Sequence, residues 1–129
     1  MADKNAKWEG LPEGFQPKNQ AGFVYLIENL DEGASPKYYI GKRNFWSRSK
    51  GVWGESKWRE YQSSSDTVKK WKNVRKRVLC LCDCAFELSY REIEMIIKSE
   101  AVLRTDFANF AIGREMIGRC PNYMLKSGK

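Results

Sequence analysis

Two tyrosines, a glycine and a lysine stand on two short segments that both have the composition of β-strands. Tyr25 lies in the first segment, and Tyr39, Gly41 and Lys42 lie in the second. Turn-forming residues fill positions 29–36, so we expect a hairpin that brings the two phenols together. Phenols and a lysine can move protons and neutralise phosphate oxygens, and a glycine allows close backbone approach. These residue types indicate a site that handles phosphodiesters.

The chain contains no histidine. Histidine is the commonest general base and a common metal ligand, so acid–base chemistry here would use tyrosine, lysine, glutamate or aspartate. Any metal site would be built from oxygen atoms, which favours Mg²⁺ or Mn²⁺ over Zn²⁺.

The net charge of +7 and the pI of about 9.3 are compatible with a polyanionic partner. Lysine and arginine neutralise phosphates and release counterions, so nucleic acid is the partner we expect, with solubility as the alternative. Residues 42–57 interleave basic and aromatic side chains, as a nucleic-acid groove requires. The alternative for this stretch is a loop whose aromatic side chains fold back onto the core.

The elements that would position these residues can be read from apolar periodicity and turn signals. We expect strands at about 22–28, 37–41 and 77–84, helices at about 63–76 and 89–99, and an irregular loop over 42–57. This order predicts a mixed α+β (α/β) domain, with a small, mainly antiparallel three-stranded sheet flanked by helices. Residues 1–20 form an extended lead-in, and 21–129 form one domain with an irregular tail.

Four cysteines, Cys80, Cys82, Cys84 and Cys120, include an i, i+2, i+4 run that would share one strand face. This spacing suits small buried hydrophobic residues better than the paired motifs of zinc sites. No apolar stretch is long enough to cross a membrane, and the N-terminus lacks a secretory signal, so we expect a cytoplasmic protein without a membrane partner.

Several short strings occur in an order that resembles the GIY-YIG endonuclease superfamily. Residues 39–41 read YIG, an intact match, whereas residues 23–25 read FVY, with Phe and Val replacing the family's Gly and Ile. Residues 58–65 follow the W-x-x-Y-x-S-S-S pattern of phage-type members. Residues 88–92, followed by Asn109, resemble the family's catalytic-glutamate helix and its later asparagine. The resemblance covers nearly the whole domain.

The resemblance implies a GIY-YIG-like fold and a phage-type homing or mobile endonuclease. Such an enzyme would hydrolyse phosphodiester bonds of DNA at one divalent-metal site. Glu92 would be the ligand of Mg²⁺ (or Mn²⁺), Tyr25 the general base, and Tyr39 a positioning residue of the catalytic group. Since one such site cuts one strand at a time, double-strand cleavage would need two successive cuts or a homo-oligomer.

Cations complete the expected catalytic group. Lys42 could lower the pKa of a nearby tyrosine. Arg48 is the candidate phosphate clamp and Arg43 its runner-up, because Ser49 occupies the position of the family's arginine. The substrate-binding candidates lie around these motifs: Gly41, Arg43, Trp46, Tyr61 and Asn109.

Each candidate also has a structural alternative. The two tyrosines could pack their rings on the core and expose their hydroxyl groups to solvent. Glu92 could close a capping box that starts at Ser89, and Glu94 is a rival carboxylate on the same helix. Asn109 could be an ordinary turn residue.

Two other functions compete with the nuclease. A catalytically degenerate nuclease-fold module could bind DNA without cutting it, since the first motif and the arginine depart from the family pattern. A small zinc-ribbon-like protein could be built on the cysteines.

Overall fold

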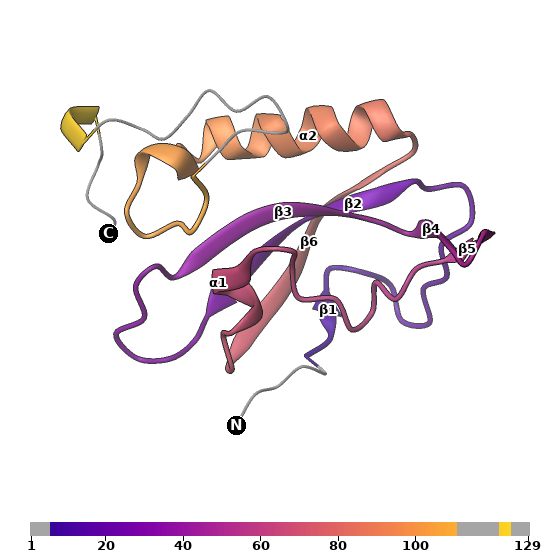
Figure 1. Cartoon of the computed structure of the whole chain (residues 1–129), viewed down its shortest axis with the longest axis horizontal. Helices are drawn as coiled ribbons and strands as arrows, with labels where there is room; N and C mark the ends of the chain where they lie inside the picture. The colour runs from indigo at the N-terminus through magenta and orange to yellow at the C-terminus, as the bar shows by residue number, and fades with distance from the viewer. Residues whose placement is uncertain (1–5, 111–121, 125–129) are drawn as a thin grey trace.

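The computed structural model describes residues 6–110 and 122–124. A four-stranded sheet in the order β1-β6-β2-β3 forms its centre (Figure 1). Its strands are β1 (Trp8–Glu9), β2 (Gly22–Asn29), β3 (Tyr38–Asn44) and β6 (Val74–Cys82). The mixed α+β class is confirmed, but the sheet has four strands rather than three, because β1 from the N-terminal segment adds to it in parallel with β6.

The strand β2 is the central strand for the site. It pairs antiparallel with β3 and with β6, and Tyr25 lies opposite Gly41 in the first pairing. Alternate residues of β2 enter two separate cores, because successive side chains of a strand point to opposite faces of the sheet. β3 is the outer strand on this side, so its residues lie at the edge of the sheet.

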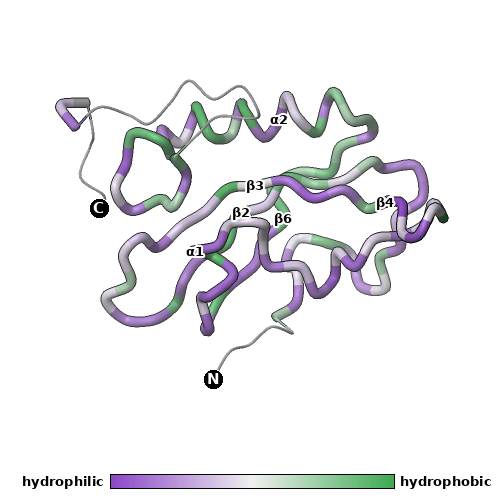
Figure 2. Tube along the Cα trace, in the orientation of Figure 1, coloured by the Kyte–Doolittle hydropathy of each residue, from purple (hydrophilic) through white to green (hydrophobic). Residues whose placement is uncertain are grey.

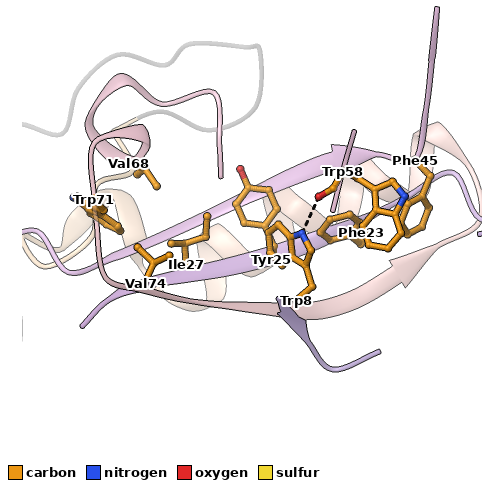
Figure 3. Close-up of a cluster of buried hydrophobic side chains, with 9 residues drawn as sticks. All are labelled: Trp8, Phe23, Tyr25, Ile27, Phe45, Trp58, Val68, Trp71 and Val74. Atoms are coloured by element: carbon orange, nitrogen blue, oxygen red, sulfur yellow. Dashed lines mark hydrogen bonds between the residues drawn. The ribbon is translucent and has the colours of Figure 1, made fainter. Parts of the chain in front are cut away.

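One face of the sheet is covered by α2 (Ala85–Lys98), which runs along it in Figure 1. The core there is aliphatic, made by Val24, Ile40, Cys82, Leu88, Ile96 and Ala101. The opposite face carries an aromatic core, shown in Figure 3. Its buried members are Trp8, Phe23, Tyr25, Ile27, Phe45, Trp58, Val68, Trp71 and Val74.

The helix α2 begins earlier than the sequence pattern indicates. Its N-cap is Cys84, whose sulfur accepts a hydrogen bond from the backbone N–H of Glu87. Ser89 and Glu92 therefore lie inside the helix, and the alternative in which Glu92 closes a capping box with Ser89 is wrong. The two ends of the expected box cannot cap a turn that is already helical.

Residues 42–57 are not an irregular loop, which corrects the expectation for this stretch. β3 continues to Asn44, and a separate hairpin follows, made of β4 (Trp46–Ser49) and β5 (Val52–Glu55). Its turn is Lys50-Gly51, in which both residues have positive φ, as a two-residue hairpin turn requires.

The expected helix over 63–76 is limited to one helical turn, and the following strand begins before the expected residue 77, which is a second correction. α1 is a single turn, Asp66–Lys69, with Ser65 as its N-cap, and β6 begins at Val74. Successive side chains of β6 alternate between the two faces of the sheet. Lys76 is buried and donates to the backbone carbonyl of Tyr61, so its ammonium group lies in the core.

Two short 3₁₀ turns complete the described chain, η1 (Ala101–Leu103) and η2 (Asn122–Met124). The sulfurs of Cys80 and Cys82 lie 3.9 Å apart, while Cys84 lies beyond the strand. Cys120 and the rest of the expected tail over 111–121 and 125–129 lie outside the described residues. No helix in the described ranges has the length and apolar character needed to cross a membrane.

Candidate active site

The Tyr25 phenol lies across the edge strand at Gly41. The two residues are register partners, and a Cβ at Gly41 would lie 2.5 Å from the Tyr25 hydroxyl oxygen. The same Cβ would lie 2.9 Å from the Tyr39 ring. Gly41 is therefore required for space, since any side chain would displace both tyrosines. Figure 3 shows the Tyr25 hydroxyl pointing away from Trp8, out of the aromatic cluster.

Three phenols meet on this face of the sheet. The Tyr25 ring centroid lies 6.2 Å from that of Tyr39 and 6.1 Å from that of Tyr61. The Arg43 guanidinium lies 4.2 Å from the centre of the Tyr61 ring. Tyr39, Gly41 and Arg43 alternate along β3, so all three point to the face that carries Tyr25. The structure thus brings together four of the expected site residues around Tyr25.

Ser63 joins these phenols and was missed by the sequence reasoning. Its side chain is buried, and its hydroxyl oxygen accepts a hydrogen bond from the backbone N–H of Ser65, 2.9 Å away. Its backbone has φ of 112°, a conformation that serine rarely adopts. Strained residues cluster at functional sites. The signal was the serine run of residues 63–65, which the pattern also explained as a helix start.

Tyr25 and Tyr39 are held as neutral phenols. Burial is the largest cause and raises the pKa of Tyr25 well above its ordinary value, with the nearby Tyr61 and Tyr39 adding to the effect. Burial also raises the pKa of Tyr39. The hydroxyl of Ser63 acts in the opposite direction, since its hydrogen bonding lowers the pKa of both phenols.

Glu92 lies on α2, over the other face of the sheet. Burial raises the pKa of its carboxyl, and the charge of Lys42 partly lowers it. Lys42 points to this face and donates a hydrogen bond to the Ser89 hydroxyl, 2.7 Å away. The site therefore has two halves on either side of β3. The Glu92 charge helps to raise the pKa of Tyr39, after the larger effect of burial, so the two halves lie near each other at this edge strand.

Lys42 does not lower the pKa of Tyr25 in this arrangement, contrary to the expectation from sequence. It lies on the other face of β3, and within the described residues its charge acts on Glu92. Glu94, the rival carboxylate, is engaged elsewhere. It accepts from Arg91 at 2.7 Å and pairs with Lys98 at 3.5 Å, so Glu92 is the carboxylate left available to a ligand.

Three expected residues lie apart from this group. Arg48 is exposed on the β4–β5 hairpin. Trp46, at the base of the same hairpin, donates its indole N–H to the backbone carbonyl of Gln20. Asn109 is buried and bonds the backbone of β3, accepting from the Ile40 N–H at 3.0 Å and donating to the Ile40 carbonyl at 2.8 Å. The Asn109 side chain thus makes the two hydrogen bonds that the backbone of a neighbouring strand would make with Ile40.

Few side chains near the site could act as ligands of a metal ion. Among the residues that the structure describes, no three or more histidine, cysteine, aspartate or glutamate side chains gather into a group. Glu92 is a half-buried carboxylate with no hydrogen bond or ion pair to a described side chain, so it can contribute an oxygen ligand. A hard cation that shares its other positions with water and phosphate fits such a site.

The sheet edge at β3 thus carries clustered phenols and flanking cations, with one carboxylate on the covering helix. The family model described as "Putative endonuclease segE, GIY-YIG domain" matches residues 8–112. The chain belongs to this family of GIY-YIG endonuclease domains, of the phage type. Searches of curated proteins and of solved structures gave no significant match. The family match includes β1, so the N-terminal strand is part of the shared domain.

Proposed function

We propose that this chain is a metal-dependent DNA endonuclease that hydrolyses one phosphodiester bond at a time at the edge of β3. The observation that supports this most strongly is the arrangement of two half-sites around one strand. Tyr25, Tyr39 and Arg43 lie on one side, and Glu92 and Lys42 lie on the other. A phosphate placed at this edge would meet proton-handling groups and cations together.

In the proposed reaction a water oxygen attacks phosphorus, and the bond from phosphorus to the 3′ oxygen breaks. The ionised form of the Tyr25 phenol, a small fraction of the protein at neutral pH, accepts the proton of the attacking water, and the departing 3′ oxygen takes a proton from solvent. The products carry 5′-phosphate and 3′-hydroxyl ends. Lys42 and Arg43 neutralise phosphate oxygens as their charge grows. Arg48, on the β4–β5 hairpin, would contact phosphates of the DNA backbone farther from the bond that is cut.

Glu92 would hold Mg²⁺ or Mn²⁺. When bound, such an ion would stabilise negative charge on the phosphate and on the leaving oxygen. Glu92 is suited to this role because its partial burial leaves a carboxylate that gains from a positive partner. Tyr39 and Ser63 would position Tyr25, and Asn109 would hold β3 in place through Ile40.

The proposal is tested by plasmid nicking in Mg²⁺ and in EDTA, with Glu92→Gln and its matched control Glu94→Gln. We expect nicking that depends on Mg²⁺ and falls by at least about 100-fold in Glu92→Gln, the size of effect seen when a stabilising charge partner is removed. Glu94→Gln lies two residues along the same helix and should cut at the wild-type rate.

The second candidate is a DNA-binding module without catalysis. Phe23 and Val24 depart from the first family motif, and Arg48 lies on the exposed hairpin apart from the tyrosines. Binding of duplex DNA without metal-dependent nicking by the wild-type protein would establish the module and exclude the enzyme.

A further inference from the structure

The β4–β5 hairpin carries exposed side chains that the catalytic site does not use. Trp53 is 64% exposed and Val52 is 68% exposed. The tip of the hairpin is hydrophobic between hydrophilic flanks, and the hairpin lies at one end of the molecule, away from α1 (Figures 1 and 2). Trp53 and Val52 are adjacent on β5, so their side chains point to opposite faces of the hairpin and leave apolar surface exposed on both.

The hairpin is anchored at its base by buried residues and hydrogen bonds. Phe45, which precedes it, is fully buried, and Ser56, which follows it, donates its backbone N–H to the Phe45 carbonyl at 2.6 Å. The Ser56 hydroxyl also donates to the Asn44 carbonyl at 2.7 Å. The turn Lys50-Gly51 has the conformation of a tight hairpin. Four-residue strands extend roughly 13 Å, at about 3.3 Å per residue.

The charges of the hairpin favour a polyanion over an apolar protein surface. Arg48 lies directly opposite Trp53, so their side chains share a face. Lys50 is exposed in the turn. Within the described ranges neither Arg48 nor Lys50 takes part in an ion pair, whereas the one acid of the hairpin, Glu55, is bound by Arg59 at 2.6 Å.

We propose that the β4–β5 hairpin is a DNA-docking wing that grips the duplex beside the bond to be cut. Arg48 and Lys50 contact backbone phosphates, and Trp53 and Val52 pack against sugars and base edges in a groove. The major groove of DNA is wide enough for a two-stranded ribbon of this kind. The hairpin follows β3 directly, so a duplex lying across Arg43 continues onto it. This proposal rests on the proposed function, which supplies DNA as the substrate.

Tryptophan fluorescence gives a direct test, since Trp53 is the most exposed of the five tryptophans. Trp8, Trp58 and Trp71 are each less than 10% exposed, and Trp46 is half-buried. The Glu92→Gln protein in EDTA is titrated with a duplex, and quenching by iodide is measured. We expect bound DNA to reduce the quenching of Trp53 fluorescence by iodide. The fluorescence that iodide quenches in the free protein should be absent in Trp53→Phe. Full iodide access at saturating DNA would overturn the proposal.

Affinity gives the second arm, with matched variants of exposed residues outside the hairpin. We expect Trp53→Ala and the double variant Arg48→Ala/Lys50→Ala each to weaken duplex binding by about 10-fold. The double variant should also reduce the slope of log Kd against log salt by about 1.8, if each cation contacts one phosphate. Phe86→Ala and Lys72→Ala should bind like the parent, as should Trp53→Phe. Wild-type affinity in all hairpin variants would refute the wing.

These measurements separate the wing from the nuclease. Binding is measured without metal and in a variant designed not to cut, so it does not depend on catalysis. A wild-type protein that fails to nick DNA, yet loses affinity in the hairpin variants, would disprove the enzyme and support the wing. Melting temperatures of the hairpin variants should equal that of the parent, because the substituted side chains are exposed.

Discussion

Tyr25 is a core residue and a site residue at the same time. Its ring packs against Trp8 at 5.2 Å between centroids, while its hydroxyl lies over Gly41. The burial that fixes the phenol also disfavours its ionised form. Even at the ordinary pKa of about 10, only about one tyrosine in a thousand is ionised at pH 7. A tyrosine base here therefore predicts a rate that increases with pH.

The Ser63 hydroxyl should determine the pH range over which the nicking rate increases. Its hydrogen bonding lowers the pKa of Tyr25 and Tyr39, so removal of the hydroxyl should raise the pKa of both and shift the pH–rate curve to higher pH. We expect Ser63→Gly to nick about 10-fold more slowly at pH 8, since a hydrogen bond to a charged group contributes about 1.5–3 kcal/mol. Glycine adopts a φ of 112° without strain, which offsets part of the stability lost with the hydrogen bond from the Ser65 N–H. An unchanged pH–rate curve in Ser63→Gly would show that the hydroxyl has no such role.

The charged carboxylate of Glu92 should lower the stability of the folded protein at neutral pH. Because burial raises its folded pKa above the ordinary value, the carboxyl favours folding below about pH 4.5, and this contribution is lost as pH rises through the folded pKa. At pH 7 the wild type carries a partly buried charge that Glu92→Gln lacks. We expect the variant to melt at a higher temperature at pH 7 and at the same temperature near pH 3. A gain of 1 kcal/mol would appear as roughly 4 °C.

Added Mg²⁺ provides the control for this comparison. A ligand that binds only the folded protein raises its melting temperature. Mg²⁺ should therefore raise the melting temperature of the wild type and leave that of Glu92→Gln unchanged. Equal shifts in both proteins would place the ion elsewhere.

At the scale of elements, part of the outer edge of β3 is hydrogen-bonded by residues 106–109, which do not form a strand. The backbone N–H groups of Lys37 and Tyr38 donate to the Asp106 carbonyl, and Ala108 donates to the Tyr38 carbonyl. The Asn109 side chain then pairs with both backbone groups of Ile40. This cover protects part of an edge strand and leaves its other end, at Gly41 to Asn44, for the site.

Asn109→Ala should therefore act on stability first. It leaves the buried N–H and carbonyl of Ile40 without their partner, which costs about 1–3 kcal/mol for each group. We expect a loss of about 2–4 kcal/mol in chemical denaturation, whereas Asn73→Ala, at an exposed asparagine, should change little. Wild-type stability combined with lost nicking would instead support the role in substrate orientation that the resemblance implies.

The same elements show what the sequence can and cannot reveal. The strands around Tyr25 and Tyr39 were predictable, because apolar runs separated by turn residues favour a hairpin. The β4–β5 hairpin was not, since its strands carry serine, arginine, glycine and glutamate and contain no buried residue, so they lack the apolar alternation of a core strand. The expected helix after residue 63 failed because Val68, Trp71 and Val74 have helical spacing, although Val74 enters the core from a strand.

The site shows the same division. Tyr25, Tyr39, Gly41 and Glu92 stand in recognisable strings, so their proximity could be predicted from order along the chain. Ser63 could not be distinguished from its neighbours in the serine run. Its role depends on a backbone φ that only the folded structure specifies.

At the scale of the whole molecule, the two cores have different relations to the site. The aromatic core lies under the phenols and includes Trp8 from the N-terminal segment, whose indole N–H donates to the Trp58 carbonyl at 2.8 Å. The aliphatic core lies between the sheet and α2. Damage to the aromatic core should therefore move Tyr25 directly, while damage to the far end of the aliphatic core should only weaken the fold.

Trp8→Ala tests this difference, with Ile96→Ala as the control from the aliphatic core. Each removes a buried side chain and should cost about 3–5 and 2–5 kcal/mol respectively, a large part of the 5–15 kcal/mol that a domain of this kind has. Nicking is measured at low temperature, where both variants remain folded by circular dichroism. We expect Trp8→Ala to lose at least about 10-fold in rate there and Ile96→Ala to keep the wild-type rate, because the Trp8 ring contacts Tyr25 and also receives the Lys76 ammonium at 4.6 Å. Equal rates in the two folded variants would mean that the aromatic core stabilises the domain without positioning the phenol.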